Sequence, residues 1–158
     1  MRNKAVALMA LVVTVGAVAA GTAIATNGSG VLSAPIVARG TLDGHFKLKL
    51  RDSSNTGDVV VQQVILQPGG YTGWHSHPGP AVVIVKSGSF TLYDADDTSC
   101  TGNTYSTGKV FVDAGYGHAH FGRNEGTTNT ELWVTYLDVP VGTSPRLDVS
   151  PSPGNCAF

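Results

Sequence analysis

The chain has 158 residues and a formal net charge of -1, a length that suits one domain. Only 13% of its residues are charged and 20 are glycine, a composition that excludes a coiled coil or a helical bundle. No basic stripe is available to bind phosphates, so a nucleic acid is not an expected partner.

Residues 1–25 have the pattern of a secretory signal peptide. Arg2 and Lys4 precede an apolar run over 5–20, and small residues follow as far as Ala23-Ile24-Ala25. An uncleaved membrane anchor is the alternative, because about 20 apolar residues span a bilayer. The run ends in an A-x-A site rather than in basic residues, which favours cleavage near Ala25. We therefore expect a secreted or extracytoplasmic protein with no stable membrane insertion after cleavage.

Short stretches of alternating polar and apolar residues follow, separated by Gly, Pro, Asn and Asp. Residues 26–39 are expected to form a leader and a first edge segment, and 40–139 a barrel. No stretch after the signal peptide shows the periodicity of a helix. The pattern predicts an all-β sandwich or small barrel. Its expected strands are Phe46–Arg51, Asp58–Gln67, Ala81–Lys86, Ser89–Tyr93, Lys109–Asp113, His118–Arg123 and Thr130–Asp138.

Residues 140–158 form an extended, Pro-rich tail that holds four of the eight prolines. Such a segment suits neither a helix nor a central strand. Cys100 and Cys156 are the two cysteines of the chain, and in an exported protein they predict one disulfide. The bridge would hold the tail against the barrel and add about 4 kcal/mol of stability by the chain-entropy model.

Four of the five histidines fall into two H-x-H pairs, His75 with His77 and His118 with His120. Residues two apart in a strand project from the same face, so each pair can direct two imidazoles at one point. Imidazole is the commonest neutral metal ligand in proteins. The fifth histidine, His45, stands beside charged residues and is expected to be solvated.

The segment from Gly69 to Gly88 resembles the first motif of the cupin family, G-x5-H-x-H-x3-E-x6-G. Its two histidines and both glycines match, whereas Ala81 replaces the glutamate. The stretch from Gly108 to Asn124 resembles the second motif, G-x5-P-x-G-x2-H-x3-N. Gly117, His120 and Asn124 match its second half, Gly115 replaces the proline, and Gly108 lies one residue too far upstream.

The resemblance implies a small jelly-roll barrel that binds one divalent transition metal ion on His75, His77 and His120. Fe, Cu, Zn, Mn and Ni are all compatible with that ligand set. His118 and Gln63 are candidates for additional ligands. With no carboxylate at Ala81, the ion would keep its full charge and attract a small anionic or oxygen-bearing ligand. The resemblance also leaves a homodimer open.

Three functions remain at this point. The first is a metal-dependent oxygenase or isomerase of a small oxygen-bearing molecule, with Glu131 and His118 as candidate catalytic groups. The second is a barrel that binds a metal or a small ligand without turnover, and the third is a structural barrel without metal. Tyr71, Trp74 and Phe121 are candidates for the mouth of a pocket or for core. Metal occupancy is expected to fall below a pH of about 6.

Overall fold

The computed structural model describes residues 33–45, 47, 48, 50 and 57–157. The predicted signal peptide lies outside the described residues, as does much of the predicted strand 46–51. Residues 35–158 are assigned to one compact unit. Its described part contains ten strands and no helix. Accordingly, the described residues include no helix of the length and hydropathy needed to cross a membrane.

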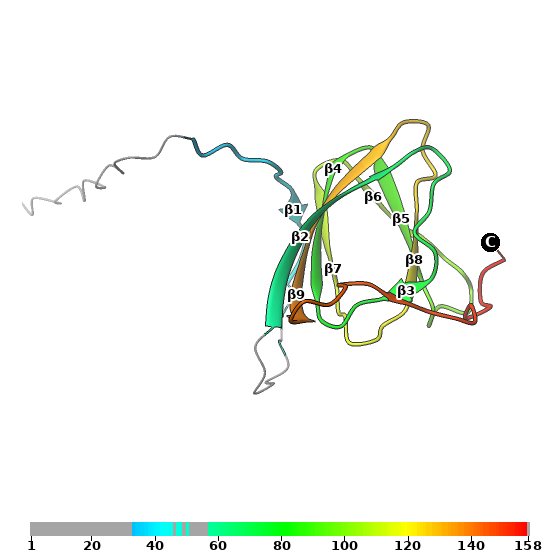
Figure 1. The fold of residues 1–158 in the computed structure, drawn as a ribbon. Helices are drawn as coiled ribbons and strands as arrows, with labels where there is room; N and C mark the ends of the chain where they lie inside the picture. Colours follow the sequence, from blue (N-terminus) through cyan, green and yellow to red (C-terminus); the bar gives the residue numbers. More distant parts are fainter. Residues whose placement is uncertain (1–32, 46, 49, 51–56, 158) are drawn as a thin grey trace, which may run out of the picture. The chain divides into compact units, whose positions relative to one another are not determined.

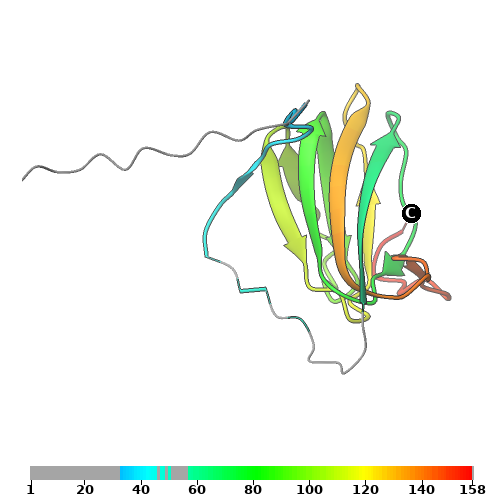
Figure 2. The same ribbon diagram turned by 60° about the vertical axis from the view of Figure 1, so that its left-hand side comes forward.

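The strands form two five-stranded sheets that face each other (Figures 1 and 2). The first sheet has the order β1 (Thr41–Leu42), β7 (Lys109–Asp113), β4 (Ala81–Ser87), β9 (Thr130–Pro140) and β2 (Gly57–Leu66). The second has the order β10 (Leu147–Asp148), β3 (His75–Ser76), β8 (His120–Arg123), β5 (Ser89–Asp94) and β6 (Asn103–Ser106).

The strand order is that of a jelly roll. Without the short outer strands β1 and β10, the two sheets read β7-β4-β9-β2 and β3-β8-β5-β6, and all their pairings are antiparallel. Except for the step from β5 to β6, the chain changes sheet from each of these strands to the next. Two antiparallel sheets of four strands linked in this way define a jelly roll. The predicted all-β jelly-roll fold is therefore confirmed.

The core lies between the sheets and follows the alternation of β9 over residues 130–137. Leu132, Val134 and Tyr136 are buried, whereas the residues between them are partly exposed. Phe90 and Phe111, from opposite sheets, stack with ring centroids 5.8 Å apart. Burying this apolar surface is the main stabilising contribution to the barrel, at about 25 cal/mol for each Å² removed from water.

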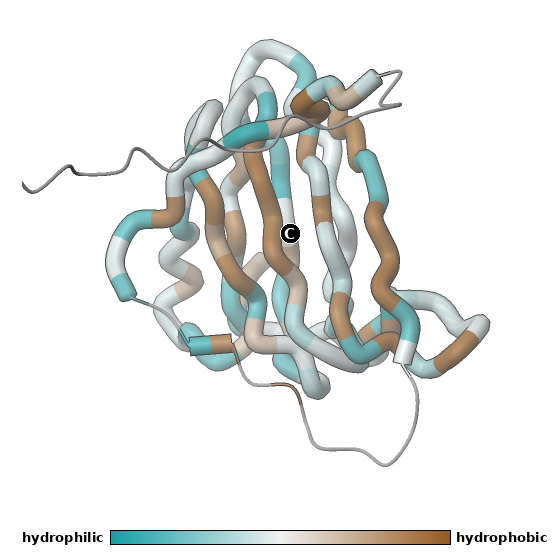
Figure 3. The backbone as a smooth tube through the Cα atoms, turned by 90° about the vertical axis from the view of Figure 1, so that its left-hand side faces the viewer, coloured by the Kyte–Doolittle hydropathy of each residue, from teal (hydrophilic) through white to brown (hydrophobic). Residues whose placement is uncertain are grey.

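The strands of the first sheet are rich in apolar residues (Figure 3), and some of these residues lie on its outer face. On β2, Val59, Val61 and Ile65 are all exposed. Apolar residues thus occupy both faces of this strand, because Val60, Val64 and Leu66 pack against the core. The homodimer that the family resemblance leaves open stays a prediction.

The tail, residues 141–157, is fixed to the second sheet and its loops at several points. Its strand β10 pairs with β3, and the amide of Val149 donates to the carbonyl of Trp74. Cys100 and Cys156 form the predicted disulfide, with Cα atoms 5.3 Å apart. The side chain of Asn155 donates to two backbone carbonyls, that of Asp94 at the end of β5 and that of Asp97 in the turn that follows. The tail is therefore built into the edge of the barrel that carries β3.

Candidate metal centre

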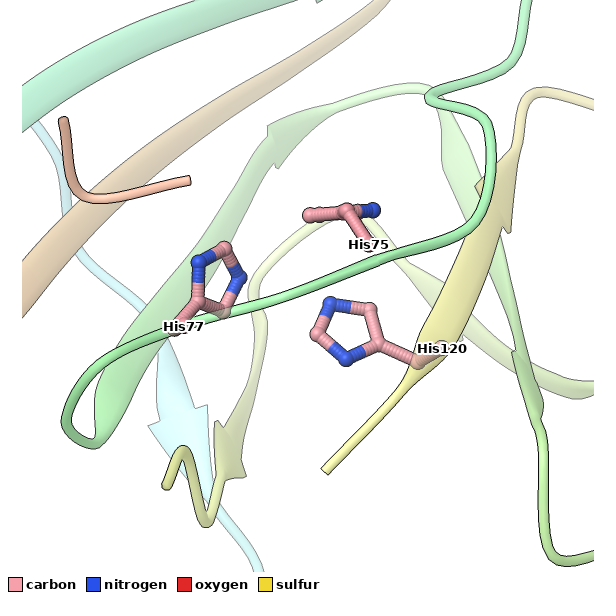
Figure 4. Close-up of side chains that lie close together, drawn as sticks. All are labelled: His75, His77 and His120. Carbon is pink, nitrogen blue, oxygen red and sulfur yellow. The ribbon is translucent and has the colours of Figure 1, made fainter. Parts of the chain in front are cut away.

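Three histidines from two separate segments meet inside the barrel (Figure 4). His75 in β3 lies directly opposite His120 in β8, and His77 follows β3 in the chain. All three are buried. The ring centroids of His75 and His120 are 4.4 Å apart, and that of His77 lies 5.0 Å from each. One ring nitrogen from each histidine lies within 4.8 Å of the others.

The backbone orients each of these rings through its Nδ1 atom. The Nδ1 atoms of His75, His77 and His120 lie 2.9, 2.7 and 3.3 Å from the carbonyl oxygens of Gly73, Pro145 and His118. A carbonyl oxygen only accepts, so Nδ1 carries the proton and the neutral ring keeps its lone pair on Nε2. Metal-ligating histidines in proteins are commonly oriented in this way. The donor set therefore fits a transition metal ion.

Burial keeps the three rings uncharged at neutral pH. Loss of solvation and the nearby His120 lower the pKa of His75 to about 3. Loss of solvation also lowers the pKa of His77, and that of His120 to about 4. Protons therefore compete with a metal ion at a more acidic pH than the value of about 6 expected for unperturbed histidines.

The three histidines help to line an apolar pocket of about 50 Å³ between the sheets. One water molecule needs roughly 10–15 Å³ on a comparable measure, so the pocket suits an ion with one or a few small groups. The pocket is lined by Val64, Thr72, Val83, Phe90, Leu92, Phe111, Leu132, Val134 and Tyr136, together with the three histidines and Asp113. A ligand in this pocket would be largely withdrawn from water.

Asp113 is a buried carboxylate in this pocket that the sequence analysis did not identify. It ends β7 and is 4% exposed. Its Oδ1 atom lies 3.1 Å from Nδ1 of His118 and 3.5 Å from Nδ1 of His120. Burial raises the pKa of Asp113, but the hydrogen bond from His118 and the charges of nearby histidines lower it below the usual value overall. Asp113 therefore adds a buried carboxylate to the lining of the pocket, beside the three histidines.

His118 does not join the cluster of His75, His77 and His120. Its ring is partly exposed and lies between two carboxylates, with Nδ1 3.1 Å from Asp113 and Nε2 3.1 Å from Asp94. The hydrogen bond that His118 donates to Asp113 and the charge of Asp94 raise the pKa of His118 to about 9. Because both ring nitrogens then carry protons at neutral pH, His118 is poorly suited to bind a metal.

Gln63 and Glu131 lie on the outer face of the first sheet, not in the pocket. Their side chains form a hydrogen bond of 2.7 Å with each other, and Glu131 also accepts from Lys86 and Trp133. Side chains alternate across a strand, and their neighbours Val64 and Leu132 line the pocket. The predictions of Gln63 as a metal ligand and of Glu131 as a catalytic base are therefore wrong.

The other residues named from the sequence lie apart from the pocket or support its frame. Tyr71 and Trp74 pack against Phe121, with ring centroids 5.4 and 5.6 Å apart, and Tyr71 and Phe121 border a separate surface hollow. His45 is exposed. Asn124 is fully buried, and its side chain bonds to three backbone groups, as expected of a turn-forming amide.

Comparisons with known proteins give structural likenesses only. No family model and no curated protein matches the chain. Three similar solved structures are the polyketide cyclase RemF from Streptomyces resistomycificus, a cupin-like protein from Thermotoga maritima, and Peruvianin-I, a cysteine peptidase from Thevetia peruviana latex.

Their sequence identities to this chain are 19%, 20% and 22%, and their TM-scores are 0.48, 0.47 and 0.43. The matches cover 62%, 65% and 50% of this chain and 66%, 73% and 49% of the respective structures. The chain thus spans about half the length of the Thevetia protein. Both cysteines of this chain, Cys100 and Cys156, are in the disulfide. The chain has a cupin-like jelly-roll fold, because its strands have that order and histidines from both motifs meet inside the barrel.

Proposed function

We propose that this chain is an exported metal-binding protein that holds one divalent transition metal ion on His75, His77 and His120. The observation that carries the proposal is the convergence of three buried, neutral imidazoles, each oriented by a backbone carbonyl. Buried polar groups are costly unless they are paired, and a shared ion would pair all three. The disulfide supports export, because such bridges persist in oxidising compartments.

Three imidazoles leave part of the coordination sphere of an ion open to a small ligand. The ion would supply Lewis acidity there, polarising a ligand oxygen or acidifying a water molecule. The protein would contribute the apolar walls that exclude solvent and restrict the ligand to a few atoms. We therefore propose a small oxygen-bearing molecule as the ligand.

Turnover by an oxygenase or isomerase is a second candidate function. A bound ion held by only three histidines would accept a further ligand, which favours this function, and the buried Asp113 supplies another polar group in the pocket. Binding without turnover needs only the three histidines and the apolar walls. The two functions differ in whether a metal-loaded sample converts small oxygen-bearing compounds or only retains them.

The test is metal stoichiometry. The mature chain, expressed without a polyhistidine tag, would be supplied in turn with iron, copper, zinc, manganese and nickel and then analysed for bound metal. We expect about one equivalent of at least one metal, lost in His77→Ala and retained in His45→Ala, the control on an exposed histidine. Failure of all five metals to reach one equivalent would leave a structural barrel as the better explanation.

A further inference from the structure

We propose that Asp113 is the carboxylate of this metal centre, acting through His120 from the strand next to Ala81. The inference rests on the proposed metal-binding function and deepens it. Asp113 would be a positioning residue: it would orient the His120 ring and place a negative charge beside the ion.

The register of the first sheet puts Asp113 beside the position where the first cupin motif has its glutamate. Ala81 in β4 and Asp113 in β7 are directly opposed across the antiparallel pair. Side chains of such a pair lie on the same face, with Cβ atoms about 4.5–5.5 Å apart. Ala81 is completely buried, and its methyl side chain offers no oxygen to a metal. The carboxylate therefore enters the pocket one strand away from its place in the motif.

The second departure from the cupin pattern, Gly115 in place of proline, contacts the same carboxylate. The amide nitrogen of Gly115 donates to Oδ2 of Asp113 at 3.0 Å, within the buried turn after β7. Proline has no N–H and would leave this oxygen without that donor. Gly115 also has a φ of 68°, and an added Cβ would lie 2.0 Å from the carbonyl oxygen of Gly79. The two substitutions in the motifs, at Ala81 and Gly115, thus both lie beside Asp113.

Asp113 lies close to His120 and belongs to a group of side chains with a net negative charge. Its Oδ1 atom and the carbonyl oxygen of His118 are the two acceptors near Nδ1 of His120, at 3.5 and 3.3 Å. On the other side, Asp94 shares His118 with Asp113. Two carboxylates flank one imidazole, so these three groups retain a negative charge whether His118 holds one proton or two. A cation on the histidine cluster would be attracted to that charge.

The main experiment compares Zn²⁺ affinity, measured by competition with a chelator, in the native protein and in Asp113→Asn. Asparagine keeps the shape and an acceptor for Gly115 but removes the charge. We expect about 10- to 100-fold weaker binding, the usual effect of losing a group that orients a metal ligand. Asp58→Asn is the matched control, because Asp58 also accepts a glycine amide, that of Gly142, but lies at the surface. Its affinity should be unchanged.

Rescue separates a role toward the metal from a role in holding the turn. Adding Ala81→Glu to Asp113→Asn returns a carboxylate from the motif position and should recover most of the lost affinity. The same change in the native protein should gain less, giving a coupling in the double-mutant cycle. If the buried glutamate prevents folding, Asp113→Glu, which keeps the charge on its own strand, should bind Zn²⁺ within a few-fold of the native protein.

The Nδ1 nitrogen resonance of His120 in the Zn²⁺-loaded protein provides a spectroscopic check, because it should shift in Asp113→Asn and stay in place in Asp58→Asn. If the native protein binds Zn²⁺ and Asp113→Asn binds it within two-fold, this inference is wrong while the proposed function stands. If the native protein binds none of the five metals, both are wrong.

Discussion

The two H-x-H segments have the same spacing but use it differently. His75 and His77 both turn their rings into the cluster, whereas only His120 of the second pair does so and His118 turns toward two carboxylates. The second segment follows a tight turn, residues 115–117, in which all three residues have positive φ. His118 lies two residues before β8 begins, and therefore outside the strand. Period-two alternation applies inside an extended strand, so the spacing alone does not place His118.

The largest expected difference is between the two histidines of the second segment. His120→Ala removes a ligand and should weaken metal binding on the order of 100-fold or more, because removing even an orienting group costs 10- to 100-fold. His118→Ala should weaken it less than about 10-fold, since the His118 side chain acts through Asp113 and the variant keeps the backbone carbonyl that orients His120. Chelator competition on both variants measures this contrast. Equal losses would place both histidines of the second segment on the ion.

The tail should affect the first segment more than the second, because it contacts His77 through Pro145 and β3 through β10. Replacing both cysteines by serine removes up to about 4 kcal/mol of stability by the chain-entropy model. The barrel should stay folded, with metal affinity reduced about 10-fold, in the range found for lost orienting contacts.

Denaturant unfolding measures the stability of this variant, and amide hydrogen exchange resolves the two segments. Faster exchange should be confined to β3 and β10 and spare β8. Uniform acceleration across β3 and β8 would show that the tail supports the whole barrel rather than the first segment.

A smaller effect concerns pH and has opposite signs for different histidines of the metal-free protein. The pKa values of His75 and His120 in the folded protein are about 3 and 4. Below pH 6.5 these two histidines are protonated in the unfolded chain but stay neutral in the folded one, so the free energy of unfolding falls as the pH drops toward 4. His118 has a raised pKa, and its contribution is complete below pH 6.5 and lost as the pH rises through about 9.

Histidine nitrogen NMR shifts of the metal-free protein follow each ring, and denaturant unfolding at pH 4.5, 6.5 and 9 follows the net effect. We expect the greatest stability at the middle pH. Normal titration of His75 near pH 6.5 would contradict the burial of the cluster.

Much of the fold could be predicted from the sequence, because the long strands alternate clearly and glycine-rich turns separate them. The short strands β1, β3, β6 and β10 do not follow from the sequence pattern, since they depend on partners that only the folded chain supplies. Gln63 was misplaced because β2 carries apolar residues on both faces, so its pattern does not reveal which face points inward. The three clustered histidines came from motif spacing, and their role as ligands stays a prediction.

Asp113 could not be found in this way. Its importance depends on its pairing with Ala81, 32 positions earlier in the chain, and the register between β4 and β7 is a property of the assembled sheet. One local signal was available: Asp113 is two residues after Phe111, which faces the core, and therefore shares its inward face. An acidic residue on the inward face of a strand is costly unless it is paired, which marks it as a candidate for function.

The tail also sets an order for the biosynthesis of the site. All three histidines of the cluster are translated before Pro145, whose carbonyl orients His77, and Pro145 is translated before Cys156. A nascent chain in which both histidine motifs have been synthesised therefore has the three histidines but not yet the tail residues that orient His77 and close the disulfide. If the chain binds a metal as proposed, loading should accordingly be a late step, favoured after oxidation has closed the bridge that retains the tail beside β3.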